Sequence, residues 1–234
     1  MDLMRTTLDA GLPTLRLDLP EQARQQLCDF GAAVVKQNEV MNLTAITEPE
    51  QVAKLHLLDS LSVVCCADLK GKTLIDVGCG AGFPGVPTAI ACPEAKITLL
   101  DSLAKRVNWL ETILPQLGIN NARCITARAE EAVAAHREKF DFATSRAVAR
   151  LNILLELTAP YVRVGGKVLA LKGAAAREEL AEAKNAINKL GLQLEEIREF
   201  PVDGAMHAVI ILRKVRSTPA QYPRRYAKIK QAPL

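Results

Sequence analysis

Apolar residues in the first third of the chain recur every three or four positions, and this spacing indicates amphipathic helices. In the first long helical pattern, Leu27, Phe30 and Val34 fall on one face. A second long helix is predicted from Pro49 to about residue 67. Its predicted buried stripe consists of Val52, Leu55, Leu58 and Leu61. These patterns predict an N-terminal helical subdomain over residues 1–68.

From residue 72 onwards, short β-branched apolar runs alternate with helical patterns. Strands are predicted at 73–77, 96–100, 122–126, 140–145 and 166–171, and helices at 84–92, 103–118, 129–135, 151–160 and 175–190. Such alternation is typical of a parallel sheet with helices on both faces. Two more apolar runs follow without a helix between them, at 192–200 and 206–213. The sequence therefore predicts an α/β fold, a doubly wound and mostly parallel sheet with an antiparallel edge hairpin, over residues 69–213.

Composition places the chain among ordinary globular proteins, with 49% hydrophobic and 24% charged residues. No apolar run approaches the ~20 residues of a membrane span. The first residues also lack the basic and apolar segments of a signal peptide. Six cysteines and three histidines are scattered without metal-ligand spacing. We therefore expect a cytoplasmic protein with free thiols, no metal and no membrane partner.

Charge is distributed unevenly along the 234 residues, whose net charge is +4. The first 68 residues are acidic, whereas residues 213–234 hold seven Lys and Arg and no Asp or Glu. A basic terminus of this kind often contacts a polyanion. Residues 214–234 are therefore predicted to be an extended basic tail that becomes ordered on contact with a partner. A solvated terminus is the alternative.

A glycine-rich loop follows the first predicted strand. Gly78, Gly80 and Gly82 allow positive φ and a close approach of a ligand to the backbone. Asp76 precedes them within the strand end, and the spacing is one residue shorter than the Gly-x-Gly-x-x-Gly of dinucleotide-binding folds. Asp101 ends the second strand. Because ligands bind at the carboxyl ends of such strands, Asp101 is expected to accept hydrogen bonds from ribose hydroxyls. An ordinary strand–helix turn with a capping Asp is the alternative.

Other polar residues are predicted near the same edge. Arg146 follows the fourth strand and is expected to point into the cleft, since an arginine is rarely buried unpaired. His56 and Asp59 are three apart on one helix and are expected to form a polar patch that closes the pocket. Cys79 lies within the glycine loop, where we expect a small space-filling side chain rather than a nucleophile.

Six motifs stand in order at residues 41–46, 56–60, 76–85, 100–106, 145–147 and 171–173. The set resembles the GidB family, the bacterial small-subunit ribosomal RNA guanine-N7 methyltransferases of the class I, S-adenosylmethionine (SAM)-dependent type. The resemblance implies a Rossmann-like methyltransferase fold and methylation of 16S rRNA at guanine 527, in the 530 loop. It also implies 16S rRNA or the small subunit as the partner of an expected monomer.

The resemblance implies the following roles for residues of this chain. Cofactor-binding residues are expected to be Asp76, Gly78, Gly80, Gly82, Phe83, Asp101, Ser102, Ala129, Glu130 and Arg146. RNA-binding residues are expected to be Lys105, Arg106, Lys172, Arg224 and Arg225. Arg146 is also expected to position the target guanine as the catalytic residue, through a hydrogen bond to O6. No general base is expected, because guanine N7 carries a free lone pair.

Two other functions remain possible from the residues alone. An NAD-dependent oxidoreductase would use a similar glycine loop, although the loop spacing and the lack of a second domain oppose it. A non-catalytic RNA-binding protein could retain the nucleotide-binding fold, although the intact Asp76, Gly78 and Asp101 oppose that interpretation.

Overall fold

The computed structural model describes residues 2–234. Its N-terminal part consists of α1 (Asp2–Gly11), a 3₁₀ turn (Leu12–Leu15), α2 (Glu21–Met41), α3 (Pro49–Val52) and α4 (Asp59–Cys66). A π-helical segment, Ala53–Leu58, joins α3 to α4 without a break. The predicted helices are thus present. Within residues 2–234, no helix combines the length and apolarity needed to cross a membrane.

The remaining elements alternate as predicted. They are β1 (Thr73–Val77), α5 (Gly85–Ala91), β2 (Lys96–Asp101), α6 (Ala104–Gln116), β3 (Ala122–Thr126), α7 (Ala129–His136), β4 (Phe140–Arg146), α8 (Leu151–Thr158), a 3₁₀ turn (Ala159–Tyr161), β5 (Val162–Lys172), α9 (Ala176–Glu182), α10 (Lys184–Lys189), β6 (Leu192–Val202), β7 (Ala205–Lys214) and α11 (Tyr226–Gln231). The region 175–190, predicted as one helix, is divided at Ala183 into α9 and α10.

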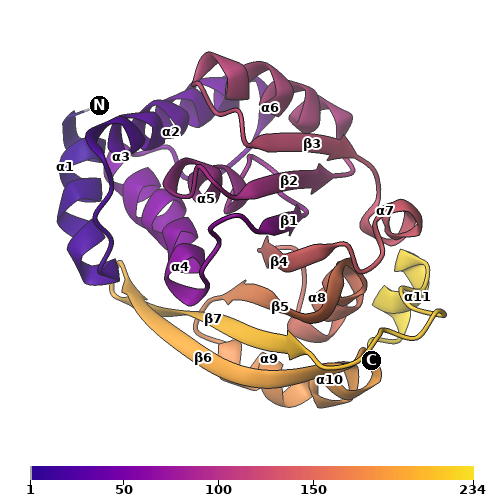
Figure 1. Ribbon diagram of the computed structural model, residues 1–234. Helices are drawn as coiled ribbons and strands as arrows, with labels where there is room; N and C mark the ends of the chain where they lie inside the picture. Colours follow the sequence, from indigo (N-terminus) through magenta and orange to yellow (C-terminus); the bar gives the residue numbers. More distant parts are fainter. Residues whose placement is uncertain (1) are drawn as a thin grey trace.

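Seven strands form one sheet in the order β3-β2-β1-β4-β5-β7-β6 (Figure 1). The strands β3, β2, β1, β4 and β5 run parallel to one another. Strand β7 is antiparallel to both β5 and β6. This arrangement confirms the predicted doubly wound sheet with an antiparallel edge hairpin. The order reverses at β1 and β4, so the carboxyl ends of β1, β2 and β4 surround the point where such sheets bind ligands.

Alternate residues along each strand pack against opposite helical layers. Leu74 and Leu99 belong to the hydrophobic cluster that includes α2, α4, α5 and α6. Ile75 and Leu100 belong to the second cluster, which includes α7, α8, α9, α10 and α11. The period-two alternation of strand side chains therefore divides the core into two layers. Because the N-terminal helices share the first cluster with the sheet, they cover one of its faces.

The predicted apolar stripe of the second helix is partly wrong. Val52 and Leu61 are buried, but Leu55 and Leu58 are only half-buried, and Leu57 is buried in their place. The π-helical segment is the physical reason, because its wider turn shifts the side chains that follow relative to an α-helical register. The same shift turns the polar side chains His56 and Asp59 toward the interior.

The prediction that residues 214–234 form an extended tail is also wrong. Residues 226–231 form α11, and Ile229 is fully buried in the second hydrophobic cluster. Arg224 donates to the fully buried carboxylate of Glu156 on α8 through its backbone N–H (2.8 Å), Nε (2.8 Å) and Nη2 (2.6 Å). A buried charge requires a partner, and this contact fixes the tail against the domain. Local sequence pattern could not reveal an ion pair between residues 68 positions apart.

Replacing Arg224 by Ala should leave the Glu156 carboxylate buried without its partner. We expect this change to lower the free energy of unfolding by about 3–5 kcal/mol, the usual cost of breaking a buried ion pair from one side. Arg225→Ala is the matched control, since that side chain is exposed and its loss should change stability by less than about 0.5 kcal/mol. Urea denaturation measures both; equal stabilities of the two variants would contradict the proposed anchor.

Candidate functional site

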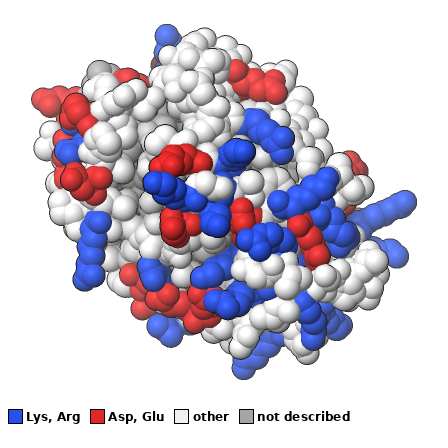
Figure 2. Space-filling model, in the orientation of Figure 1, with Lys and Arg blue, Asp and Glu red and all other residues white. Residues whose placement is uncertain are grey.

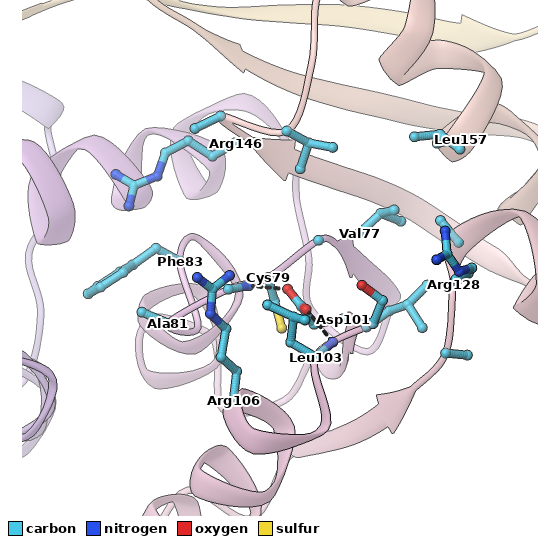
Figure 3. Close-up of a pocket in the computed structure, with 18 of the residues that line it drawn as sticks. Val77, Cys79, Ala81, Phe83, Asp101, Leu103, Arg106, Arg128, Arg146 and Leu157 are labelled. Carbon is cyan, nitrogen blue, oxygen red and sulfur yellow. Dashed lines mark hydrogen bonds between the residues drawn. The ribbon is translucent and has the colours of Figure 1, made fainter. Parts of the chain in front are cut away.

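A cavity of about 560 Å³ opens at the carboxyl ends of β1, β2 and β4. This volume lies within the ~300–1,000 Å³ of small-molecule sites. Figure 3 shows Arg146 reaching in from the end of β4 beside Phe83, with Arg106 opposite them on α6. Residues predicted for the site that line this cavity are Gly78, Gly80, Phe83, Asp101, Ser102, Arg106, Ala129, Glu130 and Arg146. Nine of the residues predicted from the sequence therefore lie around one cavity.

Asp101 organises the floor of this cavity. One carboxylate oxygen accepts a hydrogen bond from the backbone N–H of Gly80 (2.9 Å), and the other accepts from that of Leu103 (2.9 Å; dashed in Figure 3). The side chain thus joins the glycine loop after β1 to the start of α6. Each carboxylate oxygen can accept a further hydrogen bond. Asp101 therefore keeps accepting capacity toward the cavity that it lines.

Asp76 and Gly82 of the predicted cofactor-binding set do not line the cavity. The Asp76 side chain is fully buried and accepts a hydrogen bond from the backbone N–H of Gly85 (2.8 Å). Burial raises the pKa of Asp76 to about 7. A Cβ on Gly82 would meet Val86 and Leu110 at 2.8 and 2.9 Å. Both residues therefore support the loop from beneath, because they face α5 and the core rather than the cavity.

Cys79 is buried within the loop. Burial, reinforced by the nearby Asp76 and Asp101 carboxylates, raises its thiol pKa well above the ordinary value. A thiol in this state is protonated and is a poor nucleophile. The expectation that Cys79 fills space agrees with this environment.

The opposite end of the cavity combines the turn after β3 with two later segments. Ala129 and Glu130 begin α7 there, next to Leu157 of α8 and Tyr226 of α11. The Ala129 carbonyl accepts a hydrogen bond from the Tyr161 hydroxyl (2.5 Å), which fixes the backbone at this point. Sequence reasoning missed Leu157 and Tyr226, since both reach the cavity only through the packing of α8 and the tail.

Arg146 is engaged by the N-terminal helices. Its Nη1 donates to the Leu55 carbonyl (2.7 Å) and to the Asp59 carboxylate (2.9 Å), and its Nη2 donates to His56 Nδ1 (3.1 Å). The guanidinium also lies 5.1 Å from the centre of the Phe83 ring. Arg146 does point into the cleft, but it is paired there. Leu55 and His56 of the π-helical segment and Asp59 at the start of α4 take up three of its five N–H groups. A hydrogen bond from Arg146 to guanine O6 stays a prediction.

His56 is neutral in this arrangement. Burial, together with the adjacent Arg146 charge, lowers the pKa of His56 to about 4. Nδ1 lies 3.1 Å from Arg146 Nη2, which can only donate, and 3.2 Å from the Leu55 carbonyl oxygen, which can only accept. The Arg146 contact is met by the tautomer that carries its proton on Nε2, which lies 2.8 Å from Thr44 Oγ1. The imidazole also stacks on Phe83, with ring centres 4.7 Å apart. His56 thus closes one wall of the cavity, as the predicted polar patch requires.

Asp59 stays ionised although it is buried. Burial raises its pKa, but hydrogen bonds from His207 and Arg146 outweigh this effect and hold the pKa below its usual value. His207 Nδ1 lies 2.7 Å from Asp59 Oδ1, and this bond raises the pKa of His207. His207 comes from β7, so no local sequence signal could have found it.

The predicted RNA-binding residues separate into two groups. Lys105 and Arg225 are exposed and Arg106 is half-buried at the cavity. Lys172 instead donates to the Ala149 carbonyl (2.5 Å) and pairs with Glu179 (2.8 Å), while Arg224 pairs with Glu156. Lys172 and Arg224 are therefore parts of the fold, because their charges are taken up by buried or half-buried carboxylates. Figure 2 shows basic side chains gathered over the centre and right of the visible face, and α7 and α11 lie on the right of the same view in Figure 1.

The groups that line the cavity fit SAM. Asp101 offers acceptors for ribose hydroxyls, and the wall near Val77, Leu100 and Leu157 is apolar enough for an adenine ring. A Cβ on Gly80 would meet only the tip of Arg106 at 3.9 Å, so the loop leaves open space for a ligand to lie against its backbone. Among residues 2–234, no group of three or more His, Cys, Asp or Glu is placed to hold a metal ion.

Comparison with known proteins agrees with this geometry. A family model described as GidB, rRNA small subunit methyltransferase G, matches residues 23–205. The chain belongs to this family. Ribosomal RNA small subunit methyltransferase G of Clostridium perfringens (strain 13 / Type A) is 41% identical, covering 100% of this chain and 98% of that protein. The protein of the same name from Clostridium novyi (strain NT) is 43% identical, over 97% and 96%. The predicted family and its SAM-dependent methyltransferase activity are thus confirmed.

Solved structures support the fold. The M. jannaschii TYW2 structure, in complex with AdoMet, has a TM-score of 0.52 and 15% identity, covering 62% of this chain and 70% of that chain. YcgJ of Bacillus subtilis has a TM-score of 0.52 and 14% identity, covering 68% and 98%. At this low identity, both relationships show a shared fold alone. The predicted fold class is therefore confirmed, with the N-terminal helices added to it.

Gly80 offers a clean test of the cofactor site. Gly80→Ala adds a Cβ at the cavity, and we expect it to weaken SAM binding at least tenfold because the backbone can no longer touch the ligand. Gly71→Ala is the matched control, since its φ of +67° resembles the +56° of Gly80 and no atom lies within 4 Å of its added Cβ. Both variants carry a similar backbone strain of about 1–2 kcal/mol. Calorimetric titration with SAM should separate them; equal affinities would contradict this site.

Proposed function

We propose that this chain transfers the methyl group of SAM to N7 of a guanine in 16S rRNA. The resemblance to its family implies position 527, in the 530 loop, as the target. The observation that carries the proposal is the conjunction of family membership with a cavity in which Asp101, the glycine loop and Arg146 meet. Monomeric state, cytoplasmic location and the division of the chain at residues 68 and 213 stay predictions from the sequence.

The proposed cofactor site uses this chain's residues as follows. Asp101 would accept hydrogen bonds from the ribose hydroxyls, and the backbone at Gly78 and Gly80 would contact the ligand directly. Ala129 and Glu130 would read the exocyclic amine of adenine at the other end. When bound, SAM supplies an electrophilic methyl on a positively charged sulfonium. Asp59 neutralises Arg146 nearby, so the arginine adds little repulsion to that charge.

The proposed reaction requires the protein mainly to position the guanine and the methyl group. Guanine N7 carries a free lone pair, so the reaction needs no general base. His56 is neutral and hydrogen-bonded on both nitrogens, which suits a wall better than a proton carrier. Catalysis would come from holding N7 in line with the methyl group. Arg146 would act here as the residue that fixes His56 and Phe83, and thereby the shape of the site.

A methyl-transfer assay tests the proposal. Wild-type protein with tritiated-methyl SAM should label unmodified 16S rRNA at one guanine, which mapping of the modified base would locate. Replacing that base by 7-deazaguanine in a synthetic RNA should abolish transfer, because C7–H has no lone pair. Guanine at the same position is the control. Label on another base, label that survives the 7-deaza replacement or the absence of label would reject the proposed reaction. The last result would favour the non-catalytic RNA-binding alternative.

The exposed basic residues of the tail provide a separate prediction about RNA binding. Arg225, Lys228 and Lys230 are exposed. Replacing all three by Gln should reduce the magnitude of the slope of log K against log salt by about 2–3, as expected for three lost phosphate contacts. Lys36→Gln is a control on an exposed residue of the acidic N-terminal region and should leave the slope unchanged. An unchanged slope in the triple variant would remove the tail from the RNA interface.

A further inference from the structure

A second cavity of about 600 Å³ adjoins the first. The two share His56, Arg146, Ala147 and Val148, so the Arg146 cluster forms the partition between them. The second cavity is bounded by the π-helical segment, the ends of β4 and β5, and His207 on β7. The proposed binding of SAM in the first cavity gives the second cavity no role.

The lining of the second cavity suits a planar heterocycle. Ile46, Leu55 and Leu171 supply apolar surface, while Ala147 and Gly173 are small. A Cβ on Gly173 would meet no atom within 4 Å. The cavity therefore has both the apolar contacts and the free space that a nucleobase removed from its stack requires.

Two of its polar side chains, Asp59 and His207, favour one base; Lys172 and Glu179, which also line the cavity, pair with each other. Asp59 is held ionised by two donors, and each of its oxygens can accept one more hydrogen bond. Among residues 2–234, His207 Nε2 has no hydrogen-bond partner, while Nδ1 is engaged with Asp59. Guanine presents an acceptor at O6 beside donors at N1 and N2. Adenine presents an acceptor at N1 and no donor at C2, which an ionised carboxylate would repel.

We propose that the second cavity holds the target guanine, with Asp59 accepting from its N1–H and N2 amino groups and His207, protonated on both ring nitrogens, donating from Nε2 to O6. Asp59 is then the residue that selects guanine over adenine. The inference rests on the proposed function.

A cavity-filling variant tests the location. Gly173→Leu places a side chain in the second cavity without positive-φ strain, and we expect SAM affinity to be unchanged while single-turnover methyl transfer falls at least tenfold. Ala135→Leu adds the same side chain on the exposed face of α7 and is the matched control, expected to leave both quantities unchanged. Normal methyl transfer by a folded Gly173→Leu protein would overturn the inference.

A substrate change tests the role of Asp59 independently of any effect on folding. Inosine lacks the N2 amino group, so placing it at the target position should lower wild-type transfer about tenfold, as expected for one lost hydrogen bond to a charged acceptor. In Asp59→Asn, the ratio of guanosine to inosine rates should fall toward one, whatever the overall rate. Equal wild-type rates on the two substrates would overturn the assignment. Failure of the proposed function would show earlier, as no N7 methylation of guanosine by the wild-type protein.

Discussion

The guanidinium of Arg146 is the point at which the two parts of the molecule meet. It ends β4, yet its donors bind the Leu55 carbonyl, His56 and Asp59 on the N-terminal helical segment. An ion pair as buried as this one contributes little net stability, because desolvation offsets the attraction, but it tolerates few alternative geometries. Arg146 therefore fixes the N-terminal helices over the edge of the sheet and forms the wall between two cavities.

The π-helical segment is what makes this pairing possible. An unbroken α-helix would continue the apolar stripe through Leu55 and Leu58. The same α-helical spacing would then set the directions of His56 and Asp59. The wider turn instead buries Leu57 and directs His56 and Asp59 to Arg146. Single π-helical turns are rare, and they are frequently found at functional sites. Here the irregularity places three acceptors around one cation.

The basic residues of the C-terminal tail have two roles: some stabilise the fold, and others are exposed on the surface. Arg224 satisfies the buried Glu156, and Lys214 is itself fully buried, donating to the carbonyl of Ala159 (2.7 Å) and the hydroxyl of Thr218 (2.5 Å). Only part of the basic tail is therefore free to face a polyanion. The folded portion also brings Tyr226 to the cofactor cavity, so the tail belongs to the site as well as to the surface.

The sequence by itself determined the sheet, the glycine loop, Asp101 and the family. These features depend on local periodicity, on the conformational freedom of glycine and on the rule that parallel strands end at a common edge. The tertiary structure alone decided which side chains are free to act. It turned Asp76 beneath the loop, paired Arg146 with Asp59, took Lys172 and Arg224 into ion pairs and added His207 from the far end of the chain. The reason is physical: a charged group's partners, its burial and hence its pKa depend on residues distant in sequence, which no local pattern encodes.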